Sequence, residues 1–111
     1  MTTPQWAKAL TKRKFVAWLR SKKPGSIVGR TVEDCGCPVA VYIRETSGVT
    51  VSVMEDVMEP VDARGCTAGP GRALPKWAAE FISKLDITSG LPWQTPVTAR
   101  RCLKALEARS A

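Results

Sequence analysis

The chain has 111 residues, of which 44% are hydrophobic and 24% are charged, so we expect one modest hydrophobic core. It contains no histidine, which excludes Ser-His-Asp triads, Cys-His dyads and most catalytic zinc sites. Its apolar runs are far shorter than the roughly 20 residues that cross a bilayer. We therefore predict a non-enzymatic protein without catalytic residues and without a transmembrane segment.

The N-terminal residues lack the apolar stretch of a secretory signal. The four cysteines are too few and too unevenly spaced for a secreted disulfide scaffold. We therefore expect a cytoplasmic protein, folded as a single domain over residues 1–111.

The net charge of +7 is distributed unevenly along the chain. Residues 24–111 contain ten basic and ten acidic side chains, so the whole excess lies in residues 1–23, which hold no acid. Between residues 31 and 62 the balance reverses, with seven acids against one arginine. The basic side chains of the first segment are Lys8, Lys12, Arg13, Lys14, Arg20, Lys22 and Lys23.

The first predicted element is a helix over residues 12–21. The Thr11 hydroxyl is placed to cap it, and Phe15, Trp18 and Leu19 follow helical spacing. These three side chains are expected to face the core, while the basic side chains turn to water. Residues 1–23 are thus predicted to be a basic helical segment that packs on the rest of the chain or extends from it.

The next predicted elements surround the motif "DCGCP" at residues 34–38. The sequence "SIVG" before it is a short extended segment at most. Pro38 suits the first turn of a helix, which places Cys37 at or next to the N-cap and Cys35 just outside. Ser47-Gly48 is expected to close this helix.

The best predicted strand lies near residues 49–54. "VTVSV" alternates valines with hydroxyl side chains, which is the period of a strand with one buried face. Its partner is expected at residues 57–64 or in the "SIVG" segment, although Pro60 weakens the first choice or makes it an edge strand.

Two more helices are predicted in the second half of the chain. Pro75 opens one, with Ala78, Phe81, Ile82 and Leu85 as its buried stripe. The other begins at a Thr95 or Thr98 cap and buries Ala99, Cys102, Leu103 and Leu106. The expected fold is α+β, a small domain of three to four short helices with one small β element near residues 49–54.

The first functional hypothesis is a binding module for nucleic acid or another polyanion. The basic segment can lie along a phosphate backbone, while Trp6, Phe15 and Trp18 anchor the helix or stack on exposed bases. An anionic membrane surface is the weaker alternative, because these aromatic side chains are needed in the core. A solvated helix that only aids solubility is the non-functional interpretation. The predicted nucleic-acid-binding residues are Lys8, Lys12, Arg13, Lys14, Arg20, Lys22 and Lys23.

The second hypothesis is a protein-interaction regulator or inhibitor. Its acidic central face would meet a basic partner, and an exposed Trp77 or Trp93 would anchor it; packing of both tryptophans under loops is the alternative. The spacing of the acids fits no calcium loop of the EF-hand type, so a solvated face is preferred to a cation site. The clustered acids are Glu55, Asp56, Glu59 and Asp62.

The third hypothesis concerns the cysteines. A thiol at a helix N-terminus has a lowered pKa, which would make the Cys35/Cys37 pair a redox centre or a soft-metal site. Cys66 and Cys102 could complete a four-thiolate zinc site, but they lie 36 positions apart, unlike paired zinc knuckles. The alternative is that the cysteines are small buried apolar side chains, Cys102 above all. Apart from zinc, no cofactor is expected.

A last candidate is the sequence "GCTAGPGR" at residues 65–72. Gly69 and Gly71 allow backbone N–H groups to face an anion, Arg72 supplies positive charge, and a helix follows. The sequence lacks the G-x-x-x-x-G-K-[ST] pattern of a P-loop, so a plain surface loop is the alternative.

Overall fold

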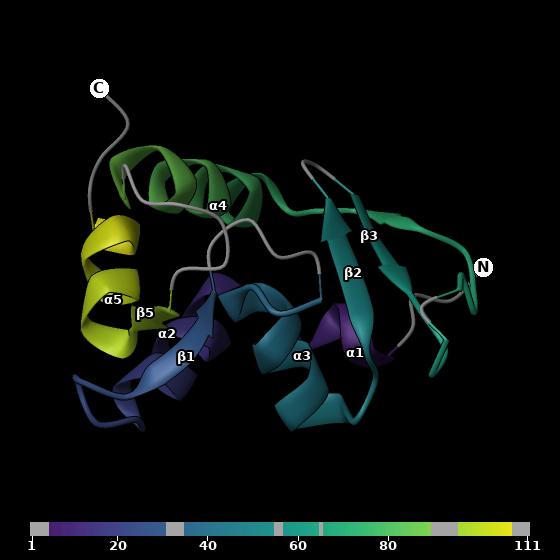
Figure 1. Ribbon diagram of the computed structural model, residues 1–111, viewed down its shortest axis with the longest axis horizontal. Coiled ribbons are helices and arrows are strands. Elements are labelled where there is room, and N and C mark those ends of the chain that lie inside the picture. Colours follow the sequence, from purple (N-terminus) through teal and green to yellow (C-terminus); the bar gives the residue numbers. More distant parts are fainter. Residues whose placement is uncertain (1–4, 31–34, 55–56, 65, 90–95, 108–111) are drawn as a thin grey trace.

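The structure is a computed structural model that describes residues 5–30, 35–54, 57–64, 66–89 and 96–107 (Figure 1). Within these ranges the chain forms five helices and two small antiparallel sheets, which confirms the α+β prediction. In chain order the elements are α1 (Gln5–Lys8), α2 (Lys12–Arg20), β1 (Ile27–Arg30), α3 (Pro38–Ser47), β2 (Val51–Met54), β3 (Val57–Pro60), β4 (Arg72–Ala73), α4 (Lys76–Ser89), β5 (Pro96–Thr98) and α5 (Ala99–Glu107).

One sheet contains the predicted strand. β2 pairs with β3, and Val51 lies opposite Pro60. The prediction that Pro60 makes this partner an edge strand is wrong, because β3 is the middle strand between β2 and β4. The proline is tolerated there because β4 pairs only with Val57 and Met58, so no ladder bond to β4 needs the missing N–H of Pro60.

The other sheet joins distant parts of the chain. β1 pairs antiparallel with β5, with Gly29 opposite Val97. The described residues therefore form a second small sheet that was not predicted. The sequence did not indicate β5, because a strand of three residues is too short to show an alternating pattern. Helix α3 contacts both β1 and β2, and Figure 1 shows it between the two sheets.

Helix ends follow the predicted signals. The Thr11 hydroxyl accepts a hydrogen bond from the Lys14 N–H at 3.2 Å, and the Thr98 hydroxyl accepts one from the Arg101 N–H at 3.2 Å. Cys37 is the N-cap of α3, although its side chain makes no capping hydrogen bond. Gly48 ends α3 with φ 77°, a conformation that favours glycine.

Removing the cap of α2 is expected to cost about 1 kcal/mol, because the Thr11→Ala variant leaves a helix N–H without its acceptor. Thermal or denaturant unfolding measures this change. Ser83→Ala, on an exposed position inside α4, serves as the control and should leave stability unchanged or slightly higher. Equal stability of the two variants would contradict the capping role.

The basic segment is part of the core. Phe15 is fully buried, and its ring centroid lies 5.3 to 5.5 Å from those of Tyr42, Trp77 and Phe81. Trp6, Leu10 and Leu19 are buried in the same cluster of side chains. The apolar side chains of residues 6–19 are therefore part of the core, while the lysines and arginines of this segment stay exposed. Among the described helices, none is long and apolar enough to span a membrane.

Candidate functional site

The outer side of α2 carries exposed cations. Phe15 and Leu19 occupy its buried side, so Arg13 and Arg20 turn away from the core, while Lys12 is exposed in the first turn of the helix. Lys12 and Arg20 are two helical turns apart, and Val16 lies between them. Lys12, Val16 and Arg20 line one groove. Helical geometry thus gathers part of the predicted basic set into one stripe.

Lys22 is held in a different place. Its ammonium lies 2.8 Å from a carboxylate oxygen of Glu45 and 5.3 Å from the centre of the Trp18 ring. The Trp18 indole N–H donates to the same oxygen at 3.2 Å. The hydrogen bond from Lys22, followed by that from Trp18, holds the pKa of Glu45 below its ordinary value. Lys22 therefore joins α3 to the residues that follow α2, and its charge is paired with Glu45.

Glu45→Gln is expected to lower stability by about 0.5–1 kcal/mol at pH 7, since the pair is partly exposed to solvent. A lowered pKa in the folded state means that this contribution is complete above the ordinary value of 4.5 and is lost as the pH falls through the folded value. Denaturant unfolding at neutral pH and at successively lower pH values measures the difference, which should shrink as the pH falls below 4.5.

Glu80→Gln is the matched control, because its carboxylate lies 3.9 Å from a Lys76 ammonium that is 90% exposed. Its effect should be near zero at each of these pH values. A pH-independent loss in Glu45→Gln would point to packing in place of charge.

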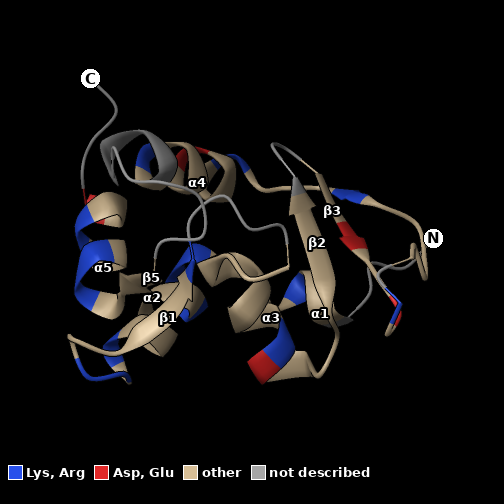
Figure 2. Ribbon diagram, viewed as in Figure 1, with Lys and Arg blue, Asp and Glu red and all other residues tan. Residues whose placement is uncertain are grey.

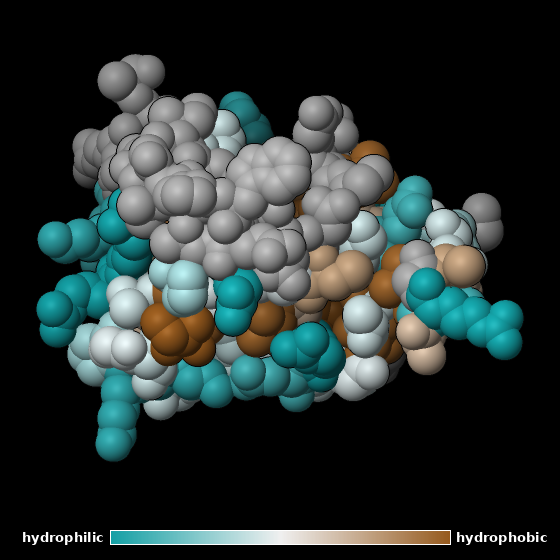
Figure 3. All heavy atoms as spheres, in the orientation of Figure 1, coloured by the Kyte–Doolittle hydropathy of each residue, from teal (hydrophilic) through white to brown (hydrophobic). Residues whose placement is uncertain are grey.

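Helix α5 adds cations that the sequence analysis did not assign to a site. Its first N–H groups anchor it to the turn after α2: Ala99 donates to the Ser26 carbonyl and Arg100 to the Pro24 carbonyl, both at 3.0 Å. Arg100 and Lys104 are exposed, while Ala99 and Cys102 are buried. Figure 2 shows blue ribbon along α5 and in the turn after α2 at the same end of the molecule, and Figure 3 shows hydrophilic side chains projecting there. The signal in the sequence was "ARRCLK", whose charges are balanced by acids elsewhere in the chain.

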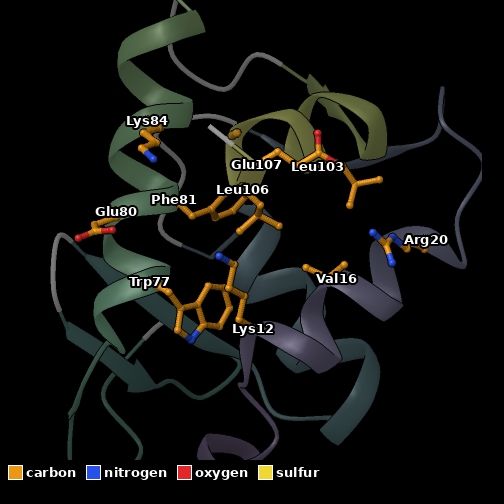
Figure 4. A pocket seen from close by; sticks show the side chains of 11 residues that line it. Lys12, Val16, Arg20, Trp77, Glu80, Phe81, Lys84, Leu103, Leu106 and Glu107 are labelled. Carbon is orange, nitrogen blue, oxygen red and sulfur yellow. The ribbon is translucent and has the colours of Figure 1, made fainter. Parts of the chain in front are cut away.

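A groove of about 610 Å³ separates α2, α4 and α5 (Figure 4). Apolar side chains from all three helices form its floor, and Trp77 stands at one end. Charged side chains of both signs stand along its rim. The floor consists of Val16, Phe81, Leu103 and Leu106, and the rim includes Lys12, Arg20, Lys84, Glu80 and Glu107.

The remaining predicted cations lie outside this groove. Lys8 is exposed on the short helix α1, which contacts α3. Lys14 is exposed on α2, and Lys23 is exposed in the turn that α5 contacts through Pro24. Of the seven predicted residues, Lys12 and Arg20 thus line the groove, Lys22 is paired with Glu45, and the others, Arg13 included, are exposed outside the groove.

The four cysteines do not converge on a metal. None of them forms a disulfide, and no three metal-ligating side chains come together among the described residues, which include all four cysteines. Cys66 is exposed, Cys35 is half-buried, and Cys37 and Cys102 are buried. Burial, and to a lesser extent the nearby Cys37, raises the pKa of the Cys102 thiol to about 12.

Cys66 is expected to react rapidly with a thiol reagent at pH 8 and Cys102 only after unfolding, because a buried thiol of raised pKa supplies almost no thiolate. Mass spectrometry of peptides after timed alkylation distinguishes the sites. Labelling in denaturant provides the control for intrinsic reactivity. Prompt labelling of Cys102 in native protein would contradict its burial.

The glycines of the predicted phosphate loop pack against β3. A Cβ at Gly69 would lie 3.0 Å from the Pro60 ring, and one at Gly71 would lie 3.0 Å from Cγ of Glu59 and 3.3 Å from its carboxylate oxygen. These glycines therefore permit close packing on β3, beside a negative charge. Arg72 is the first residue of β4 and pairs with Met58 in the sheet.

The structure describes some of the predicted acidic and tryptophan residues. Asp62 accepts hydrogen bonds from the Arg64 and Cys66 N–H groups, and Glu59 accepts one from the Thr67 hydroxyl. Trp77 is half-buried against the core. The other acids of the predicted face, Glu55 and Asp56, and the second tryptophan, Trp93, lie outside the described residues.

Comparison of the chain with protein-family models, curated proteins and solved structures finds no match.

Proposed function

We propose that this protein binds nucleic acid through a basic surface formed by α2 and α5. The observation that carries the proposal is the anchoring of α5 against the turn after α2, which brings exposed cations from two distant parts of the chain to one end of the molecule. The residues assigned to phosphate contacts are Lys12, Arg13, Arg20, Arg100 and Lys104.

Phosphate contacts are the chemistry that such a surface offers. Each lysine or arginine that neutralises a phosphate releases condensed counterions, so affinity falls as salt rises. Arginine also places several N–H donors in a plane that matches phosphate oxygens. The proposal is a binding module, and it assigns no catalytic residue.

Three double variants of equal net charge test this surface. Arg13→Gln/Arg20→Gln alters α2, Arg100→Gln/Lys104→Gln alters α5, and Arg44→Gln/Arg64→Gln removes two exposed cations from α3 and the turn after β3. Each lowers the formal net charge from +7 to +5. Fluorescence anisotropy with random DNA and RNA at several salt concentrations reads out the binding.

The α2 and α5 variants should each flatten the plot of log affinity against log salt by roughly 1.4 to 1.8, the slope for two lost phosphate contacts. The Arg44/Arg64 variant should retain the slope of the unaltered protein. Equal losses in all three variants would mean that only net charge matters. Absence of binding at low salt by the unaltered protein would remove the proposal and leave a protein partner as the function to pursue.

A further inference from the structure

The geometry points to a preference for single-stranded nucleic acid: we propose that the groove between α2, α4 and α5 takes an unpaired base against Trp77. This inference rests on the proposed function, because the same surface supplies the phosphate contacts. The groove, of about 610 Å³, falls within the range of about 300 to 1,000 Å³ that is typical of small-molecule sites.

Trp77 offers the stacking surface. Its ring packs against buried Phe15, with centroids 5.5 Å apart and planes tilted by 41°. It is nevertheless only half-buried and lines the groove (Figure 4). Because Phe15 supports the ring from behind, little freedom is lost when a base stacks on its groove side.

Charge complementarity selects the occupant of the groove. Lys12 and Arg20 stand on its α2 side, next to an apolar floor. A nucleotide has this same combination of an apolar face and an attached anion. Glu80 and Glu107 stand on the α4 and α5 sides, and Glu80 is next to the Lys76 ammonium at 3.9 Å. Lys84 also stands on the α4 side, so the α4 and α5 sides carry charges of both signs, whereas the charges on the α2 side are all positive and favour the phosphates there.

The structure of a duplex excludes it from this groove. Paired bases are stacked inside the helix, and an enzyme or binding module reaches one only by unpairing it. A purely electrostatic surface would favour the duplex, because its charge density is higher and its salt slope is steeper. Preference for a single strand therefore requires a contact with the bases, and Trp77 is the contact assigned here.

The test compares fluorescein-labelled oligothymidylate and oligouridylate with a hairpin duplex of equal phosphate number. The unaltered protein should bind at least one of the single strands roughly tenfold more tightly than the duplex, and Trp77→Leu should lose roughly tenfold on the single strand alone. The salt slope of this variant should not change. Trp18→Leu is the matched control, because Trp18 is also half-buried but lies beside Glu45, outside the groove.

Each outcome separates the two proposals. Salt-dependent binding without a preference for the single strand overturns the groove assignment and leaves the basic surface intact. The same conclusion follows if the two tryptophan variants lose affinity equally. Absence of all binding overturns both proposals. The comparison of strands in the unaltered protein decides the matter even if leucine at position 77 disturbs the fold, which circular dichroism monitors.

Discussion

Phe15→Ala is expected to lower the free energy of unfolding by about 3–5 kcal/mol, a large part of the stability of a small protein. Phe15 is fully buried, and rings from α2, α3 and α4 surround it. Removing the ring loses the free energy gained by burying its apolar surface. It also leaves a cavity that the surrounding helices cannot close, so the side chains around it lose packing contacts. Denaturant unfolding followed by circular dichroism measures the loss.

Val16→Ala is the neighbouring control, since Val16 is half-buried at the groove and loses far less apolar surface. A Phe15→Ala variant as stable as Val16→Ala would show that the ring cluster is not the centre of the core. The burial of Phe15, Leu10 and Leu19 also means that the basic segment cannot be deleted to test binding. Its charges have to be replaced by neutral side chains on an intact fold.

Gly29→Ala is expected to cost about 3 kcal/mol, the upper end for overpacking. A Cβ at Gly29 would lie 2.6 Å from the Pro38 nitrogen and 2.9 Å from the Gly36 carbonyl oxygen. Both are backbone atoms, so no side chain can rotate to make room. The added methyl would push β1 away from the start of α3 and break the hydrogen bond from the Arg30 N–H to the Gly36 carbonyl, now 2.9 Å.

Gly25→Ala is the control for this substitution, because a Cβ there meets nothing within 4 Å. Thermal unfolding of the two variants should differ by several degrees or more, with only Gly29→Ala strongly affected. Equal melting temperatures would mean that β1 does not lie against α3 as the structure has it.

Local signals predicted the helices well. Thr11, Thr98 and Gly48 cap their helices as expected because each signal acts within four residues of the chain. Pro38 begins α3 for the same reason. Where a residue's role is decided by its immediate neighbours in sequence, the sequence is sufficient.

Long-range pairing could not be predicted. β5 is too short to show alternation, and its partner β1 lies almost 70 positions earlier, so only the assembled fold defines the pair. The same holds for Lys22, which looked like a free cation and is held by Glu45 of another helix. The signs of charges are visible in a sequence, whereas their neighbours are not.

Part of the candidate site was predicted from the sequence and part was not. Lys12, Arg13 and Arg20 were assigned from the charge excess of the first 23 residues. Arg100 and Lys104 were missed because acids elsewhere balance them in the count. The groove with Trp77 depends on three helices from both halves of the chain, and no spacing along the sequence indicates it.

The junction of β5 and α5 has a consequence for synthesis. Thr98 ends the strand and Ala99 begins the helix without an intervening loop, so pairing with β1 and docking beside α2 happen together. A ribosome that has delivered α2 has therefore produced only half of the proposed binding surface, and the other half arrives with the last described helix. Because the ends of so long a loop must meet before their contacts contribute, we expect a nascent chain to bind nucleic acid more weakly through the proposed surface until α5 has left the exit tunnel.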